Sequence, residues 1–165
     1  MIWKCLVLTL FLIQSAYADV LSGRVVGVAD GDTITVLDST NTQHKIRLGG
    51  IDAPEKKQAY GNVSKKSLSD MVFNQQVDVE WHKKDRYGRK VGKVLLKDED
   101  INIEQIKLGM AWFYKKYKGE LVQEDRIYYE EAQQEAEANQ VGLWVDAYPI
   151  PPWEFRKQPK VQRTD

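Results

Sequence analysis

The chain is poor in the residues that build disulfides, zinc sites and histidine-based catalysis. Its 165 residues include one cysteine, Cys5, and only two histidines, His44 and His82. A single cysteine can form neither an internal disulfide nor a cysteine-rich zinc site. The two histidines are far apart in sequence and match no metal-ligand spacing. These shortages exclude a disulfide scaffold and argue against a zinc enzyme or a two-histidine ribonuclease.

The chain also lacks net charge, because 24 lysines and arginines balance 24 aspartates and glutamates. A protein that holds nucleic acid tightly by charge alone is usually basic. The balance therefore argues against a passive high-affinity binder, but not against an enzyme that must release its product. The charge is unevenly distributed, since residues 83–90 and 115–118 are basic and aromatic while residues 120–137 are mostly acidic.

The apolar run at residues 5–13 is too short to span a bilayer. It follows a positive charge at Lys4 and precedes Ala16-Tyr17-Ala18, which fits the small-x-small pattern of signal cleavage. We predict that residues 1–18 are a signal peptide and that the mature chain is periplasmic or secreted and free of the membrane. A buried N-terminal strand or a retained anchor is the alternative interpretation.

Alternating apolar and polar residues predict five short strands, at residues 24–29, 33–37, 45–48, 77–81 and 90–96. Helical patterns are expected at residues 59–73, 102–108 and 121–139. Five strands with helices inserted late predict a mainly β fold with some α (α+β), a five-stranded Greek-key OB-fold barrel with about three helices. We expect one domain at residues 19–148, followed by a proline-rich basic tail at residues 149–165.

The helical patterns also make predictions about individual residues. Asn102 is expected to cap the second helix, which should end before Gly109. The buried stripe of the first helix is expected to contain Val63, Leu68, Met71 and Val72. In the third helix, spacing by four predicts a buried stripe of Tyr128, Ala132 and Ala136.

Three carboxylates, Asp32, Asp52 and Glu55, lie beside predicted turns, and Asp30 is a fourth nearby. Oxygen ligands of this kind suit a hard cation such as calcium, which also accepts backbone carbonyls and water. Aspartates are common in turns for purely structural reasons, so any one of them alone would be weak evidence. The hypothesis of a cation site depends on the whole set.

Two arginines, Arg47 and Arg89, complete the candidate chemistry. On its predicted strand Arg47 must point away from the apolar face, and it precedes the segment of Asp52 and Glu55. Bidentate guanidinium donors match the charge and shape of phosphoryl oxygens in a phosphodiester transition state. A solvated surface position is the alternative for either arginine alone.

Four segments together resemble the signature blocks of the staphylococcal nuclease family, in its order and spacing: Asp30-Gly31-Asp32-Thr33, Ile46-Arg47-Leu48, Ile51-Asp52-Ala53-Pro54-Glu55 and Asp85-Arg86-Tyr87-Gly88-Arg89. The resemblance covers about residues 22–145. It implies a five-stranded barrel and a calcium-dependent endonuclease that hydrolyses DNA and RNA with little sequence specificity.

The resemblance also implies roles for individual residues. Asp32, Asp52 and the carbonyl of Ala53 would hold calcium, and Glu55 would activate the attacking water. Arg47 and Arg89 would bind the reacting phosphate, while Arg86, Tyr87, Tyr114 and Tyr117 are the candidates for binding substrate. Ala53 departs from the threonine of the staphylococcal enzyme, which leaves the carbonyl but removes a hydroxyl.

We expect the chain to be a monomer. We also expect it to prefer single-stranded substrates, because stacking on tyrosines tolerates any base and single strands fit a barrel groove. A non-catalytic nucleic-acid-binding barrel is the main alternative, although such modules typically lose the acidic and arginine set that this chain retains. A further alternative is an envelope protein that binds a partner through the Pro151-Pro152-Trp153 tail.

Overall fold

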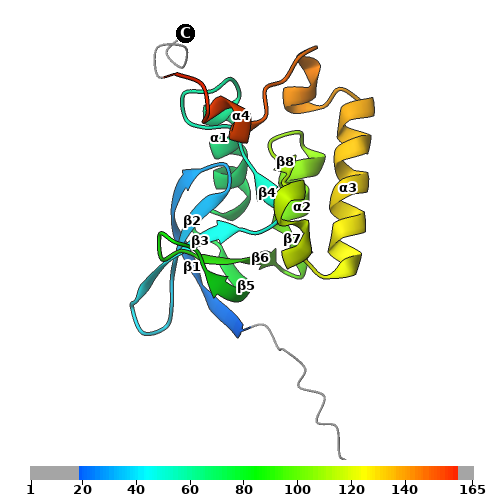
Figure 1. Ribbon diagram of the computed structural model, residues 1–165. Helices are drawn as coiled ribbons and strands as arrows, with labels where there is room; N and C mark the ends of the chain where they lie inside the picture. The colour runs from blue at the N-terminus through cyan, green and yellow to red at the C-terminus, as the bar shows by residue number, and fades with distance from the viewer. Residues whose placement is uncertain (1–18, 160–165) are drawn as a thin grey trace, which may run out of the picture.

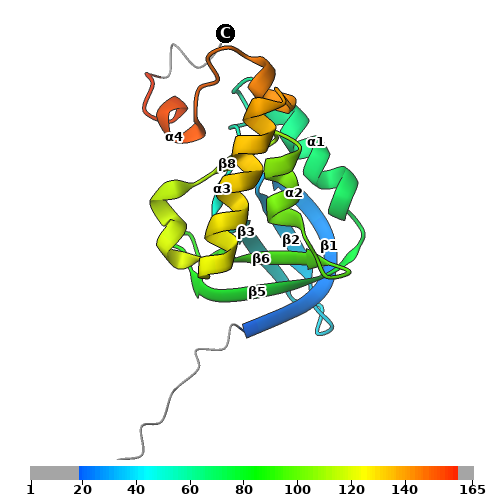
Figure 2. The same ribbon diagram turned by 90° about the vertical axis from the view of Figure 1, so that its right-hand side faces the viewer.

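The computed structural model describes residues 19–159. The predicted signal peptide at residues 1–18 and the last six residues lie outside the described part. Figure 1 shows a barrel of strands with helices at one end and along one side, and Figure 2 shows the same arrangement turned by 90°. Within residues 19–159, no helix is both long enough and apolar enough to cross a membrane.

Five strands close into the barrel: β1 (Asp19–Asp30), β2 (Thr33–Leu37), β3 (Gln43–Leu48), β5 (Gln76–Lys84) and β6 (Lys90–Leu96). Antiparallel pairs join β3 to β2, β2 to β1, β1 to β5 and β5 to β6. A parallel pairing of β3 with β6, centred on Arg47 opposite Val91, closes the ring. The predicted five-stranded barrel is therefore confirmed.

Three further strands are only two residues long. β7 (Glu99–Asp100) pairs antiparallel with the end of β6, whereas β4 (Ile51–Asp52) pairs with β8 (Trp112–Phe113) in a separate ribbon. The ribbon matters for the site, because Asp52 lies in β4 and pairs with Trp112.

The helices pack on one end and one side of the barrel. They are α1 (Gly61–Val72), α2 (Ile101–Lys107), α3 (Gln123–Ala138) and a single turn, α4 (Pro152–Phe155), with 3-10 turns η1 (Lys115–Glu120) and η2 (Gly142–Val145). α1 contacts β1, and α2 lies between β6 and α3 (Figures 1 and 2). The three expected helices are present, with bounds shifted by a few residues.

The predicted cap of the second helix was wrong. Asp100 is the N-cap of α2, and its side chain accepts hydrogen bonds from the backbone N–H groups of Asn102 and Ile103. Asn102 lies inside the first turn and is fully buried. Aspartate and asparagine both favour the cap position. The cap is Asp100 because strand β7 ends at this residue and the helix begins directly after it. As expected, the helix ends before Gly109, which has a positive φ of 63°.

Two predicted members of the helix stripes are also wrong. Val63 of α1 and Tyr128 of α3 are about half exposed, whereas Leu68, Val72, Ala132 and Ala136 are buried as expected. Tyr129 is buried in place of Tyr128, and its hydroxyl donates to Asp100 at 2.7 Å. One position along a helix rotates a side chain by about 100°, so a tyrosine pair leaves the choice of face to tertiary packing.

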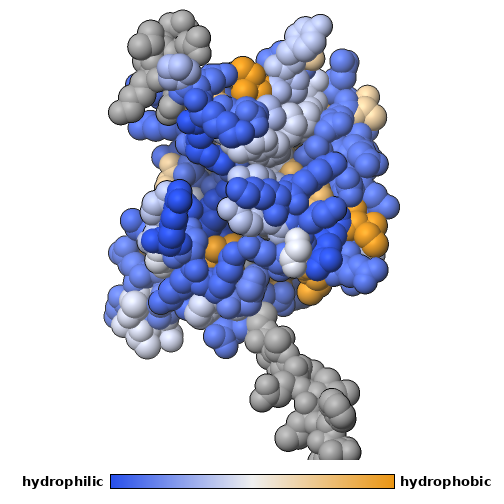
Figure 3. Space-filling model, viewed as in Figure 1, coloured by the Kyte–Doolittle hydropathy of each residue, from blue (hydrophilic) through white to orange (hydrophobic). Residues whose placement is uncertain are grey.

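One hydrophobic core fills the barrel and continues under α1, α2 and α3, with Ile34, Ile46, Leu48, Ile106 and Phe113 almost fully buried. A smaller cluster of Ala136, Leu143 and Trp144 lies beside it. The face seen in Figure 1 is mostly hydrophilic, with scattered apolar patches (Figure 3).

Candidate active site

A cleft of about 760 Å³ lies beside the barrel, bounded by the β1–β2 turn, the β3–β4 segment, the β5–β6 loop, η1 and the C-terminal segment. All ten site residues predicted from the sequence line it: Asp32, Arg47, Asp52, Ala53, Glu55, Arg86, Tyr87, Arg89, Tyr114 and Tyr117. Residues from segments far apart in sequence therefore share one cavity, although their roles remain predictions.

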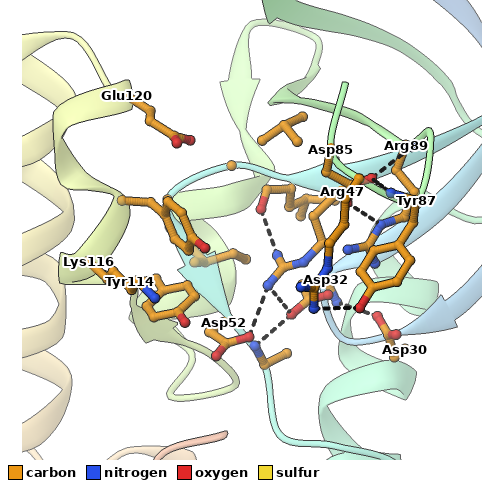
Figure 4. Close-up of a pocket in the computed structure, with 18 of the residues that line it drawn as sticks. Asp30, Asp32, Arg47, Asp52, Asp85, Tyr87, Arg89, Tyr114, Lys116 and Glu120 are labelled. Carbon is orange, nitrogen blue, oxygen red and sulfur yellow. Dashed lines mark hydrogen bonds and ion pairs between the residues drawn. The ribbon is translucent and has the colours of Figure 1, made fainter. Parts of the chain in front are cut away.

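Arg47 joins the two aspartates at the floor of the cleft. Its Nη2 lies 2.9 Å from Asp52 Oδ1 and 3.1 Å from Asp32 Oδ2, and Figure 4 shows these contacts. Its Nη1 donates to the carbonyl of Leu48 at 2.8 Å. The backbone N–H of Ala53 donates to Asp32 Oδ2 at 2.7 Å. Each group is fixed from several directions, so the two carboxylates converge in one orientation.

Arg89 reaches the same floor through Thr33. The Thr33 hydroxyl donates to Asp32 Oδ1 at 3.0 Å, and Arg89 Nη1 lies 3.4 Å from the same hydroxyl oxygen. Asp85 holds Arg89 from behind, because its Oδ2 accepts from Arg89 Nε at 2.7 Å (Figure 4). Asp85 Oδ1 accepts from the backbone N–H groups of Tyr87 and Arg89, which fixes the turn. The sequence motif contained Asp85 but did not reveal this supporting role.

Two buried amides of α2 hold the loops that carry the aspartates. Gln105 Nε2 donates to the carbonyl of Gly31, next to Asp32, at 2.8 Å. Asn102 Nδ2 donates to the carbonyl of Gly49, in the segment that leads to β4, at 2.9 Å. A Cβ on Gly31 would lie 1.8 Å from the Ser64 hydroxyl, so only glycine fits there. The site geometry therefore depends on the packing of α2 against the barrel.

Burial disfavours the charged form of two aspartates that line the cleft, Asp52 and Asp30. Burial raises the pKa of Asp52, although Arg156 and Arg47 oppose this effect. Burial, together with the nearby charge of Asp32, raises the pKa of Asp30 to about 6. A cation that binds beside such carboxylates stabilises their ionised form.

Glu55 lies at the edge of this floor, and its carboxylate is partly exposed. Arg156, four residues after Pro152, contacts it: Nη1 donates to Glu55 Oε1 at 2.7 Å and Nη2 donates to Asp52 Oδ2 at 2.7 Å. Burial lowers the pKa of Arg156, but the hydrogen bonds to Asp52 and Glu55 outweigh it and raise the pKa above its ordinary value. Sequence reasoning missed Arg156, and the only local signal was a basic residue after a proline-rich, aromatic segment.

The residues expected to bind substrate lie on two sides of the cleft: Arg86 and Tyr87 are in the β5–β6 loop, which we call the outer wall, and Tyr114 and Tyr117 are at η1 (Figure 4). Tyr87 is 68% exposed, and Arg86 lies over its ring at 4.8 Å while also donating to its hydroxyl. Across the cleft, Tyr114 packs edge-on against Tyr117 and stacks face to face on Trp153, with the Tyr114 and Trp153 ring centroids 5.1 Å apart. One face of Tyr114 is thus already covered by the C-terminal segment, whereas Tyr87 is open to solvent.

Within residues 19–159, no three acidic, histidine or cysteine side chains form a metal-binding group. The donors that do converge are the oxygens of Asp32 and Asp52, both within 3.1 Å of the same nitrogen of Arg47. This hard-oxygen donor set fits calcium, which commonly completes its shell with backbone carbonyls and water.

Comparisons with known proteins show which family this chain resembles. The family model of staphylococcal nuclease homologues matches residues 45–146. An uncharacterized endonuclease of Haemophilus influenzae is 46% identical over 138 residues, which are 84% of this chain and 74% of that protein. A micrococcal nuclease of Shigella flexneri is 38% identical over 154 residues, covering 88% of this chain and 85% of the relative. The chain therefore belongs to the staphylococcal nuclease family.

Proposed function

We propose that the chain is a calcium-dependent endonuclease that hydrolyses phosphodiester bonds of DNA and RNA with little sequence preference. Relatives named endonuclease and micrococcal nuclease support a hydrolase that acts on nucleic acid. The observation that carries the proposal is the convergence of Arg47, Asp32 and Asp52, with Arg89 joined to them through Thr33.

In this proposal Asp32, Asp52 and the carbonyl of Ala53 hold the calcium ion. When bound, the ion supplies positive charge that polarises the phosphoryl group. The protein side chains then perform the other parts of the reaction.

Glu55 accepts a proton from water as the water oxygen forms its bond to phosphorus. The opposite phosphorus–oxygen bond breaks, and the departing oxygen takes a proton from solvent. Arg47 and Arg89 stabilise the negative charge that accumulates on the phosphoryl oxygens during this exchange.

Single-stranded substrates suit the outer wall of the cleft. The exposed ring of Tyr87 offers a stacking surface that accepts any base, and the neighbouring guanidinium of Arg86 can pair with a backbone phosphate. Base edges are not needed for such contacts, so we propose weak sequence preference and the use of both DNA and RNA.

The decisive experiment uses residues 19–165 and a labelled single-stranded DNA oligonucleotide, with calcium or with a chelator. We expect shortening of the oligonucleotide with calcium and none with chelator, and strong loss of cleavage in Glu55→Ala. Retention of uncut DNA in a mobility-shift gel under both conditions would instead favour a non-catalytic binding barrel.

We also propose that residues 1–18 direct export and are removed. The basis is the order of charge, apolar run and small-residue site in the sequence. Amino-terminal sequencing of the protein from the cell envelope or culture medium should give a chain that starts near Asp19, whereas a retained Met1 would refute the proposal.

A further inference from the structure

The C-terminal segment, residues 150–158, packs beside the cleft and makes several contacts there. Trp153 stacks on Tyr114 with ring planes only 4° apart and packs edge-on against Trp112. Gln58 Nε2, from the loop after Glu55, donates to the carbonyl of Ile150 at 2.6 Å. Pro152 and Phe155 of α4 are buried. These contacts place the end of α4 against the loop that carries Glu55.

These contacts place the guanidinium group of Arg156 between the carboxylates of Asp52 and Glu55. Arg156 Nη2 donates to Asp52 Oδ2 at 2.7 Å, while Nη1 lies 2.7 Å from Glu55 Oε1 and 3.2 Å from Asp52 Oδ1. Among the described residues, the hydrogen bonds and ion pairs of the Glu55 carboxylate all go to Arg156. Two nitrogens at a fixed angle therefore determine where the Glu55 carboxylate lies relative to Asp52.

The neighbouring lysine shows that this contact differs from an ordinary surface ion pair. The side chain of Lys157 is 71% exposed and pairs with Glu154 one turn earlier on the surface. Exposed ion pairs of that kind contribute little to stability. The Asp52 side chain, by contrast, is only 2% exposed, so its pair with Arg156 is shielded from solvent on one side. A fork-shaped guanidinium can bridge two carboxylates, whereas an ammonium group acts as a single point charge.

We propose that Arg156 is a positioning residue of the catalytic centre, which holds the Glu55 carboxylate beside Asp52 in the orientation needed to accept a proton from water. This inference rests on the proposed nuclease function. Under this proposal the segment from Ile150 to Gln158 belongs to the site, because the packing of Trp153 and Phe155 positions the guanidinium group of Arg156. A small misplacement of a catalytic group can reduce a rate about a hundredfold.

The rival role for the same contact is competition with the cation. Arg156 occupies oxygens of Asp52 that calcium would also use, so its removal frees ligand atoms and eliminates a nearby positive charge. Both roles predict tighter calcium binding after Arg156→Ala. They differ in rate, because loss of a positioning residue slows cleavage at saturating calcium and loss of a mere competitor does not.

The test compares residues 19–165 in native form with Arg156→Ala, Arg156→Lys and the matched control Lys157→Ala. Lys157→Ala removes one positive charge from the adjacent position but touches neither Asp52 nor Glu55. Cleavage of a single-stranded DNA oligonucleotide gives kcat and KM at saturating calcium. Calorimetric titration of calcium without DNA gives cation affinity independently of activity, and thermal unfolding confirms that each variant is folded.

We expect Arg156→Ala to lower kcat by roughly ten- to a hundredfold with little change in KM, while calcium binds several-fold more tightly. Added guanidinium ion, far below denaturing concentrations, should restore part of the rate of Arg156→Ala. Arg156→Lys should fall between Arg156→Ala and the native chain, and Lys157→Ala should match the native chain. A purely structural defect would weaken calcium binding and would not respond to guanidinium.

Unchanged or faster cleavage by Arg156→Ala at saturating calcium would overturn the inference and assign Arg156 as a competitor of the cation. Equal loss in Lys157→Ala would also overturn it, since the effect would then follow from charge alone. If the native chain itself fails to cut, the proposed nuclease function fails first, which distinguishes that outcome from a failure of the positioning role.

Discussion

The two walls of the cleft are built differently. On the barrel wall, Asp52 is 1% exposed, and Arg47 contacts both aspartates and a backbone carbonyl. On the outer wall, Tyr87 is 68% exposed, and Arg86 lies over its ring and donates a hydrogen bond to its hydroxyl. The barrel wall fixes its groups from several directions, as phosphoryl chemistry requires. On the outer wall the ring of Tyr87 stays open to solvent, as stacking of varied bases requires.

The largest effect is expected on the barrel wall. Arg47→Ala should lower kcat a hundredfold or more, about 3–4 kcal/mol of barrier, because it removes a preorganised donor to the developing charge. Single-turnover cleavage at saturating calcium measures this. Lys45→Ala is the matched control, since Lys45 lies two residues earlier on the same face of β3 and is exposed. Near-native turnover by Arg47→Ala would remove the distinction between the walls.

A smaller effect is expected where the barrel meets the outer loop. Asp85→Ala should lower kcat roughly tenfold, because Asp85 orients the guanidinium of Arg89 and accepts two backbone hydrogen bonds in the turn. Asp85→Asn keeps acceptors for the turn but loses the charge, and should retain more activity. If Asp85→Ala changes KM alone, Arg89 belongs with substrate binding and not with the chemistry.

Asp30 allows a test by pH without substrate. A pKa raised to about 6 means that the folded state binds this proton more tightly than the unfolded chain does. Stability is therefore lost as pH rises from about 4 to 6, when the buried carboxylate must ionise. In chelator, Asp30→Asn should raise the free energy of unfolding by about 1–2 kcal/mol at pH 8 and by almost nothing at pH 4.

Urea unfolding at the two pH values measures this difference. The amide oxygen that Asp30→Asn introduces can still accept from the Asp32 N–H, as the carboxylate of Asp30 does, so the turn is preserved. An equal effect at pH 4 and pH 8 would show that ionisation is not the cause.

The smallest effect is expected on the outer wall. Tyr87→Ala should raise KM several-fold with little change in kcat, at the lower end of the about 1–3 kcal/mol that one stacked base contributes, because the ring is already 68% exposed. Tyr148→Ala is a suitable control, since Tyr148 is 87% exposed and lies outside the cleft lining. A large fall in kcat in Tyr87→Ala would show that the outer wall also shapes the reacting geometry.

Local patterns in the sequence predicted the barrel well because strand alternation directly reflects which face is buried. They predicted helix faces less well. Tyr128 and Tyr129 are adjacent and chemically identical, and only the packing of α3 against Asp100 buries the second. The cap of α2 was missed for a similar reason, because strand β7 enters the helix two residues before the position that the sequence pattern favoured.

The candidate site was predictable where its residues form blocks in the sequence, and all ten predicted residues line one cleft. Its supports were not predictable. Gln105 and Asn102 act through buried amides whose partners are distant in sequence, and Arg156 meets Asp52 across 104 positions. Contacts over such separations leave no periodicity in the chain, so only the folded structure reveals them.

The most direct test of the central claim is a double-mutant cycle on single-turnover cleavage at saturating calcium, with Arg47→Ala, Glu55→Gln and the double variant. Groups that act on one phosphorus in one step show strongly non-additive effects. We predict that the double variant is scarcely slower than the slower single variant. Loss in the double variant equal to the product of the two single losses would contradict a single centre built from these side chains.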